Sequence, residues 1–504
     1  MTTVETPGQN KQDMKLFWAC FVGLSTTSFG FILRALTLPQ WGSEFNLTNT
    51  QIGEISGVGL WPFAISIVLF SLVIDKVGYK NAMIFAFLCH LSSAVLTLFA
   101  TGYWSLYIAT FIMALGNGTI EAVINPVVAT IFSKQKTKWL NILHAGWPTG
   151  LVLAGLLALT FGEETSWKFK MILILLPTIV YGVMMWSRTF PVNERVKAGV
   201  SYLEMLKEVG VGGMLVVTTL VVFQIGSIFQ WAPMTNVIIT ISIVLVFGYY
   251  VRSFGQPIFV LLILLMIPLA TTELGTDSWI SDLMAPEMKQ IGLQAGWILI
   301  YTSAIMAFLR LFAGSIVHKI SPLGLLSVSS AIACVGLLLL SVSSGITVLL
   351  AATLFALGKT FFWPTMLGVV SERFPKGGAL TLNITGGVGM IAAGVIGTVI
   401  LGFVQDKRID ANLTQYDQTN KTELRGTYAT ELKQSLFGEY QSIDAAKLTN
   451  ATAEDQQVVK GIQESAKKEA LKTVALFPVI MLITYLFLIF YFRSKGGYKP
   501  IALE

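Results

Sequence analysis

The chain has 504 residues, of which 54% are hydrophobic and 12% charged, and its mean hydropathy is +0.70. Soluble proteins usually carry about 25% charged residues, so this composition excludes an ordinary soluble domain. The formal net charge of +6 is spread over separate loops and forms no basic patch, so it gives no indication of a nucleic-acid partner.

Apolar runs long enough to cross a hydrocarbon core of about 30 Å recur along the chain. The sequence therefore predicts an all-α, polytopic membrane protein, and no cofactor is expected. About fourteen spans are expected, in the order six, two and six. Their predicted ranges are 15–39, 52–74, 81–101, 104–131, 140–161, 169–187, 211–231, 234–251, 257–280, 293–317, 323–343, 346–370, 379–404 and 472–493.

This order predicts an N-terminal six-helix bundle over 1–190 and a basic linker with an inserted transmembrane hairpin over 191–254. A C-terminal six-helix bundle over 255–493 and a cytoplasmic tail over 494–504 follow. The C-terminal bundle contains a polar, non-cytoplasmic segment, 405–470, with a candidate helix near its end at 452–472.

Basic residues cluster in alternate loops, whereas the intervening short loops are neutral or acidic. Loops rich in Lys and Arg stay in the cytoplasm, so both termini are expected there. We expect a monomer in the inner (plasma) membrane of a bacterium.

The two sets of six spans show internal similarity. Gln51-Ile52-Gly53 corresponds to Gln294-Ala295-Gly296, 243 positions later, and "LNILHAG" at 140–146 corresponds to "LNITGGV" at 382–388. Asn125-Pro126 corresponds to Trp363-Pro364. Matches in the same order with similar offsets indicate two parallel repeats.

The stretch "SLVIDKVGYK" at 71–80 resembles the loop 2–3 signature of the major facilitator superfamily, Gly-x-x-x-Asp-[Arg/Lys]-x-Gly-x-[Arg/Lys]. The resemblance implies a twelve-helix core that works by alternating access, with these loops taking part in switching. Arg310, one turn before the second copy, is assigned to the same gating contacts. The gating residues are Asp75, Lys76, Gly78, Lys80, Arg310, Gly314, His318 and Lys319.

Within the superfamily, "LPQW", "NLTNTQIG", "GTIEAVINP" and "WLNILHAGWPTG" resemble the fucose permease branch of sugar:proton symporters. In that branch a span-4 Glu, five residues before the Pro of an Asn-Pro pair, takes part in proton-coupled transport, and Glu121 stands at that position. The branch also has a span-1 Asp shortly before "LPQ", where this chain has Arg34-Ala35.

Ionisable residues inside a bilayer are costly and indicate function. Glu121 and Lys359 each precede a Pro by five residues, so the repeat predicts that they face each other across a central cavity. Arg34 is expected to pair with Glu121 and hold it charged. Glu273 and Asp277 are four residues apart on one helix face, and one of them is expected to pair with Lys359.

Aromatic and amide side chains are expected to complete the solute site, since flat rings pack on sugar faces while amides bind hydroxyls. Asn141 and Asn383 are repeat mates, for which a structural or gating role is equally open. The candidates are Trp147, Trp279, Trp363, Asn125, Asn141 and Asn383.

These features predict a secondary active transporter, not an enzyme, that moves a monosaccharide together with protons. Two alternatives stay open: an exchanger of an organic anion or sugar acid that uses Arg34 and Lys359 as counter-charges, and a membrane sensor that transports nothing.

Overall fold

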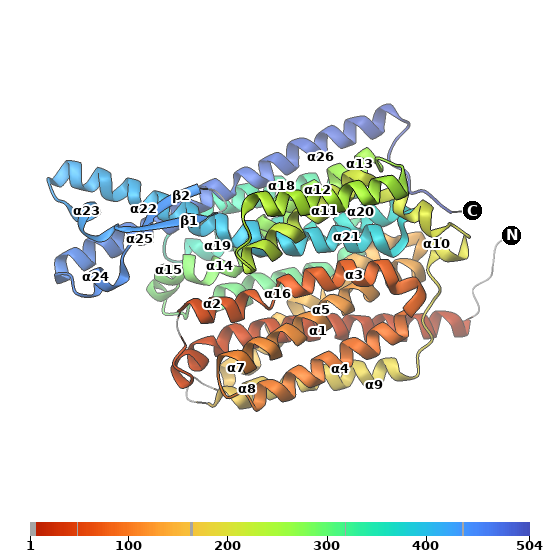
Figure 1. Cartoon of the computed structure of the whole chain (residues 1–504), viewed down its shortest axis with the longest axis horizontal. Coiled ribbons are helices and arrows are strands. Elements are labelled where there is room, and N and C mark those ends of the chain that lie inside the picture. Colours follow the sequence, from red (N-terminus) through yellow and green to blue (C-terminus); the bar gives the residue numbers. More distant parts are fainter. Residues whose placement is uncertain (1–6, 48, 162–164, 318, 436–437, 504) are drawn as a thin grey trace.

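The computed structural model describes every residue except 1–6, 48, 162–164, 318, 436–437 and 504. Its long helices run side by side, and a smaller unit projects beyond them at one end (Figure 1). The first helix begins at the opposite end, where the chain also finishes. We call these the cap end and the termini end. Among the described residues, thirteen helices are long and apolar enough to cross a membrane.

This architecture confirms the predicted all-α polytopic class, with one difference in the spans. The predicted span 293–317 is divided into α16 (Trp297–Leu311) and α17 (Ala313–Val317), because the helix ends at Phe312. At 15 residues, α16 is shorter than the other candidate spans.

The N-terminal half contains six spans, several of them built from two consecutive helices. The helices are α1 (Pro7–Glu44), α2 (Asn49–Gly57), α3 (Trp61–Val77), α4 (Tyr79–Leu98), α5 (Tyr103–Ile131), the 3-10 turn η1 (Ser133–Gln135), α6 (Lys136–His144), α7 (Gly146–Thr160), α8 (Trp167–Ile172) and α9 (Leu175–Trp186).

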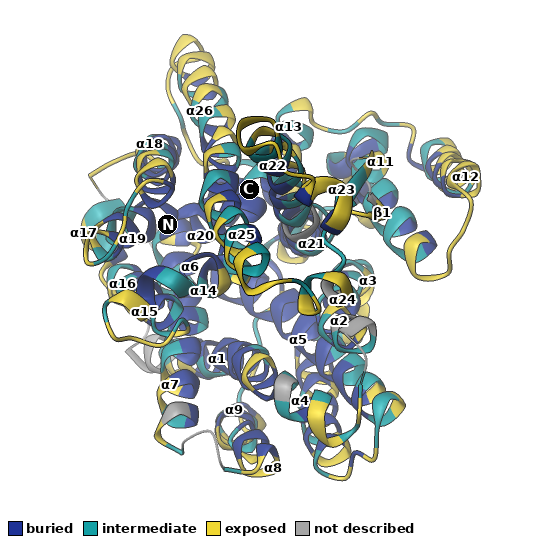
Figure 2. Cartoon of the chain, turned by 90° about the vertical axis from the view of Figure 1, so that its left-hand side faces the viewer, coloured by how far each residue is buried: buried dark blue, intermediate teal, exposed yellow. Residues whose placement is uncertain are grey.

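Between the halves lie the short α10 (Glu194–Lys197) and the hairpin of α11 (Tyr202–Ile228) and α12 (Pro233–Val251). A capping box starts α11, since Ser201 and Glu204 each accept a hydrogen bond from the other's backbone N–H. Figure 2 shows α12 at the edge of the molecule with α11 between it and the bundle. The inserted pair of helices is therefore present, and α12 leaves most of its apolar surface exposed.

The C-terminal half also contains six spans, two of which include a π-helical turn. Its elements are α13 (Pro257–Ala270), η2 (Thr271–Gly275), α14 (Thr276–Leu283), α15 (Ala285–Gln290), α16, α17, α18 (Pro322–Leu340), α19 (Thr347–Lys359), α20 (Phe362–Arg373), η3 (Pro375–Gly377), α21 (Gly378–Ile391), η4 (Ala392–Gly397), α22 (Thr398–Asn420) and α26 (Leu476–Ser494).

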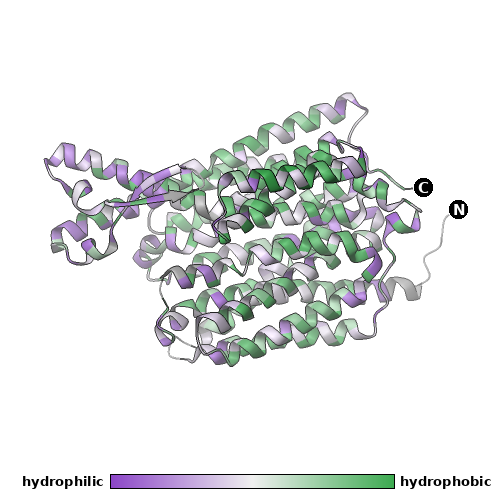
Figure 3. Ribbon diagram, in the orientation of Figure 1, coloured by the Kyte–Doolittle hydropathy of each residue, from purple (hydrophilic) through white to green (hydrophobic). Residues whose placement is uncertain are grey.

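The projecting unit, which we call the cap, is hydrophilic, in contrast to the bundle (Figure 3). Its first helix is the end of α22, and its last, α25 (Ala453–Val474), continues into α26 with a break only at Ala475. The predicted helix at 452–472 is thereby confirmed. The remaining elements are α23 (Leu424–Tyr428), the antiparallel strands β1 (Glu431–Ser435) and β2 (Gly438–Ser442), and α24 (Ala445–Thr449).

Two helices at the junction of the two halves are buried on all sides over much of their length. Every residue from Gly116 to Ala129 in α5 and from Ala379 to Ala393 in α21 and η4 is buried. The polar side chains that these helices carry are consequently held in the centre of the molecule, where the candidate site lies.

Candidate functional site between the two halves

Two small cavities lie where the halves meet, and both are lined from the two sides. The Glu121 chamber, of about 30 Å³, is lined by Phe63, Glu121, His144, Trp147, Glu273, Leu274, Arg310, Trp363 and Met390. The Asp277 chamber, of about 40 Å³, is lined by Phe31, Leu60, Trp147, Leu151, Leu274, Asp277, Ser278, Leu299, Met390 and Ala393. Trp147, Leu274 and Met390 line both. Each chamber has room for little more than a water molecule, so the protein is closed around its centre.

Glu121 is buried in α5 and has an uncharged partner. Asn125 donates from Nδ2 to Glu121 Oε2 at 2.7 Å, and to the backbone oxygen of Glu121 at 3.1 Å. The Oδ1 atom of Asn125 accepts from Nε2 of His144 at 2.8 Å. His144 therefore belongs to the site, although it was not among the residues predicted for it.

Three prolines explain why polar groups gather at this point. A proline inside a helix leaves the carbonyl four residues earlier without its usual N–H donor, and in a membrane a neighbouring group must supply one. Pro126 frees the carbonyl of Ala122, which accepts from Nδ2 of Asn383 at 3.0 Å. Asn383 lies in the other half, so the Asn-Pro pair creates a contact between the halves.

Arg310 donates hydrogen bonds to the carbonyls that the other two prolines leave free. Its Nε atom donates to Thr360 O at 2.6 Å and one terminal nitrogen donates to His144 O at 3.0 Å. These are the carbonyls that Pro364 and Pro148 leave free. The other terminal nitrogen forms an ion pair with Glu273 Oε1 at 2.8 Å. The predicted gating role of Arg310 is thus wrong in its placement: the side chain is buried at the centre, where its donors match three acceptors.

Lys359 does not face Glu121. It forms an ion pair with Asp277, within the C-terminal half, and its ammonium lies 5.0 Å from the centre of the Phe355 ring. The repeat locates both residues correctly along their helices, but α14 is closer to Lys359 than α5 is. Lys359 is completely buried, and this pairing leaves it without free charge for a solute.

Arg34 and Glu121 are not paired either. At 1.5 Å per residue, Glu121 lies roughly 27 Å along α5 from its start at the cap end, whereas Arg34 lies roughly 15 Å from the end of α1 at the same side. The guanidinium of Arg34 instead lies against Gly59, where an added Cβ would come within 2.3 Å of a terminal nitrogen. It also lies 5.9 Å from the centre of the Phe31 ring.

Of the predicted aromatic residues, Trp147 and Trp363 line chambers and Trp279 does not. The ring of Trp279 lies beside Gly402 of α22. Trp279 follows Asp277 by two residues, which is about 200° around a helix, so the two side chains point in different directions. Trp279 therefore lines neither chamber in the closed protein, and its contact with the solute stays a prediction.

Asn141 and Asn383 form reciprocal contacts between the halves. Asn141 Nδ2 donates to Thr365 Oγ1 at 3.2 Å and Asn383 Nδ2 to Ala122 O at 3.0 Å. Each is buried, and the Oδ1 atom of each has no hydrogen-bond partner in the described part of the chain. Their similarity as repeat mates thus extends to their bonding.

At the termini end the halves are held together by polar contacts that the sequence did not reveal. Glu372 accepts from Thr137 Oγ1 at 2.5 Å and from Tyr498 OH at 2.8 Å, and its backbone oxygen accepts from Ile501 N at 2.8 Å. Lys136 pairs with Glu194 of the linker at 2.6 Å and donates to Ser371 O of the C-terminal half at 3.3 Å. Tyr498 and Ile501 of the predicted tail therefore fold back onto α20.

The predicted gating loops lie beside these contacts. Asp75 forms an ion pair with Arg195, Lys76 lies over the ring of Tyr202, and Gly78 has a positive φ of 82°. Gly314 packs on the stem of Lys138, and Lys319 is exposed. His318 lies outside the described residues.

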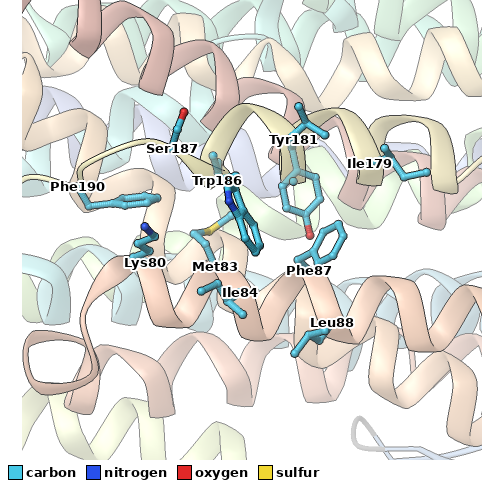
Figure 4. Close-up of a pocket in the computed structure, with 13 residues that line it drawn as sticks. Lys80, Met83, Ile84, Phe87, Leu88, Ile179, Tyr181, Trp186, Ser187 and Phe190 are labelled. Atoms are coloured by element: carbon cyan, nitrogen blue, oxygen red, sulfur yellow. The ribbon is translucent and has the colours of Figure 1, made fainter.

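Lys80 lines a separate groove of about 760 Å³ between α4 and α9 (Figure 4). Its other lining side chains are mainly apolar, and Val183 and Trp186 are strongly exposed. The groove shares no residue with either chamber and opens on the outer face of the N-terminal half, so it is not the solute site.

The model of the Major Facilitator Superfamily matches residues 18–394, which is most of the chain. The chain belongs to the Major Facilitator Superfamily. Members of this family are transporters, which agrees with the class that the sequence predicts.

Among solved structures, this Major Facilitator Superfamily chain resembles the E. coli fucose:proton symporter, with 13% sequence identity over 92% of this chain and 97% of that chain and a TM-score of 0.57. This likeness shows a shared fold with a sugar:proton symporter. The expected resemblance to that branch is therefore confirmed at the level of the fold.

Two curated relatives are more similar in sequence over shorter stretches. The gentisate transporter of Corynebacterium glutamicum is 27% identical over 36% of this chain and 40% of its own length. A probable 4-methylmuconolactone transporter of Cupriavidus pinatubonensis is 29% identical over 34% of this chain and 41% of its own length. The matches therefore span about two fifths of the length of these relatives.

Proposed function

We propose that the protein moves a small polar solute together with protons, by alternating exposure of the chambers at the cap end and the termini end. The observation that carries this proposal is Glu121: a buried carboxyl group that lines the Glu121 chamber, bonded to an amide and to no cation in the described part of the chain. A buried carboxyl without a counter-charge takes up a proton more readily than one that a neighbouring cation holds ionised.

The contacts around Glu121 also supply a route by which its charge would affect the opposite half. Asn125 and His144 connect it to Arg310, which pairs with Glu273 of η2. A change in charge at Glu121 would alter the hydrogen bonds of Asn125 and, through His144, the contact with Arg310. This is the kind of two-state contact that alternating access requires.

Two solute classes are compatible with the chambers. A monosaccharide, the solute predicted from the sequence, is favoured by the Trp147 and Trp363 rings and by the fold shared with a sugar:proton symporter. An organic anion is favoured by Arg34 and by relatives named for gentisate and 4-methylmuconolactone transport. Coupling to protons is common to both.

The test is uptake into proteoliposomes with and without an inward proton gradient, over sugars and organic acids. The Glu121→Gln variant should lose accumulation against a gradient and keep exchange of solute between the two sides. Glu54→Gln is the matched control, since Glu54 is bonded to Tyr103 OH at 2.5 Å and lines neither chamber. Full accumulation by Glu121→Gln would refute the proposal.

We further propose that the cytoplasm holds both termini and that the membrane is the bacterial plasma membrane. Alternating basic loops support this orientation. The halves 1–190 and 255–493 are proposed as the two units that move relative to each other, with the linker and inserted hairpin 191–254 between them.

A further inference from the structure

The charged side chains near the chambers do not all have opposite charges beside them. Lys359 is paired with Asp277 and Arg310 with Glu273. Two charged groups are left, the guanidinium of Arg34 and the carboxyl of Glu121, and each lacks an ion-pair partner in the described part of the chain.

Arg34 is the more unusual of the two. It is only 6% exposed, and none of its guanidinium N–H groups has a hydrogen bond to a described residue. An uncompensated buried cation is costly, so its presence indicates an anionic partner that is supplied from elsewhere. A guanidinium presents a planar set of donors that fits both oxygens of a carboxylate.

Its position fits such a partner. Phe31 precedes Arg34 by one turn and Leu60 follows Gly59, and both Phe31 and Leu60 line the Asp277 chamber. The ring of Trp147 lies 5.9 Å from that of Phe31 and borders both chambers. A solute held at Arg34 therefore has aromatic walls beside it, in the direction of Glu121.

We infer that the transported solute is a ring-bearing monocarboxylate and that Arg34 binds its carboxylate group. This inference rests on the proposed coupling of protons through Glu121. Lys359, which the sequence suggested as a second counter-charge for an anion, is not part of this site because it is paired with Asp277.

Charge balance favours a monoanion over a neutral sugar. With His144 as the neutral imidazole, the charges of ionised Glu121 and Arg34 sum to zero although the two groups are not paired. The charges of the two ion pairs also sum to zero. When Glu121 binds a proton, one positive charge is left over at Arg34, and one carboxylate neutralises it. A neutral sugar with a proton would leave that charge unbalanced inside the membrane, and a dicarboxylate would overcompensate it. The expected stoichiometry is one proton per monoanion, with no net charge moved.

The experiment uses two matched pairs of probes in proteoliposomes of the full chain: 4-hydroxybenzoate with 4-hydroxybenzamide, and glucuronate with glucose. Protein-free liposomes correct for passive entry. We expect at least one acid, and neither neutral partner, to accumulate in an inward proton gradient. The rate should not change when a membrane potential is imposed with potassium and valinomycin.

The variants separate the charge from its position. Arg34→Gln should raise the acid concentration that gives half-maximal uptake roughly tenfold to hundredfold, because a charge-assisted bidentate contact is lost. Gly59→Ala keeps the arginine but places a methyl group where the guanidinium lies, and should weaken binding in the same direction. Arg252→Gln, which changes an arginine beside the Tyr249 ring outside the chambers, is the control.

The outcomes distinguish this inference from the function on which it rests. Accumulation of neither acid, or unchanged acid uptake in both the Arg34→Gln and Gly59→Ala variants, overturns the inference. If glucose accumulates in the same vesicles, the proposed proton coupling is supported and the inference of a monocarboxylate solute is overturned. If an acid exchanges in an Arg34-dependent manner but ignores the proton gradient, the anion site stands and coupling through Glu121 fails.

Discussion

Asn141 and Asn383, 242 positions apart, each cross from one half of the protein to the other with a single amide hydrogen bond. The two residues occupy corresponding positions in the two repeats. Each has a buried Oδ1 atom without a hydrogen-bond partner in the described part of the chain. Reciprocal contacts of this kind let the halves separate by breaking the same few bonds on each side. We propose that these two hydrogen bonds stabilise the closed state and act as its latches.

Replacing Asn383 with Ala should favour opening at the junction of the halves. The change removes one buried hydrogen bond, worth about 1 kcal/mol, which shifts the ratio of open to closed molecules about fivefold. The measurement is the distance distribution between spin labels on α6 and α20. Thr385→Ala serves as the control, because Thr385 bonds to Thr381 O within the same helix. Equal distributions in both variants would argue against a latch.

Arg310 and Glu273 should be coupled in stability. Arg310→Leu leaves the buried carboxyl of Glu273 without its counter-charge, and is expected to lower the free energy of unfolding by about 3–5 kcal/mol. The double variant Arg310→Leu with Glu273→Leu should recover part of that loss, since both charges are removed. Thermal unfolding in detergent, followed by tryptophan fluorescence, measures the cycle. A double variant no more stable than Arg310→Leu would contradict a paired role.

The sequence predicts the spans well because a helix in lipid must be apolar over its whole length, a property that each segment carries alone. It also locates Glu121 and the Asn-Pro pair, which lie within one helix. The partners of Arg310 lie 37, 50 and 166 positions away in the chain. No local pattern brings these residues together, so its contacts depend on how the helices are packed.

His144 was overlooked for a similar reason, although a signal was present. Pro148 follows it by four residues and leaves its carbonyl free, which predicts a donor from another helix. The pairing of Lys359 with Asp277 in preference to Glu121 depends on the depth and proximity of three helices. The repeat offset contains no information about either.

The contacts of Glu372 predict that the C-terminal tail is held in place. Tyr498→Phe removes the 2.8 Å hydrogen bond to Glu372 and leaves the ring packed on Phe492. Limited proteolysis after α26 should become several-fold faster, because each buried hydrogen bond contributes about 1 kcal/mol. Ser494→Ala removes a local bond to Tyr491 O and should leave the rate unchanged. Identical rates for all three proteins would mean that the tail is held by other contacts.

Two neighbouring lysines of α25 should differ in their effect on the cap end of the bundle. Lys468 pairs with the buried Glu287 and also donates to Ser343 O at 3.0 Å, whereas Lys467 pairs with the exposed Asp282. Lys468→Met should therefore speed hydrogen exchange over 276–290, and Lys467→Met should have little effect, since exposed pairs contribute about 0–1 kcal/mol. Equal acceleration by both would show that burial does not decide the strength of these pairs.

The continuity of α25 with α26, and of α22 with the π-helical turn before it, has a mechanical consequence. The cap is attached through these helices to the C-terminal half and is braced against α14 and α15 by the same lysines. Any rotation of that half about the chambers must sweep the cap through a larger arc than the helices beneath it. The cap therefore moves with the C-terminal half and amplifies its rotation. The distance between a pair of dyes on α24 and α2 would report how the two halves are arranged at the buried junction.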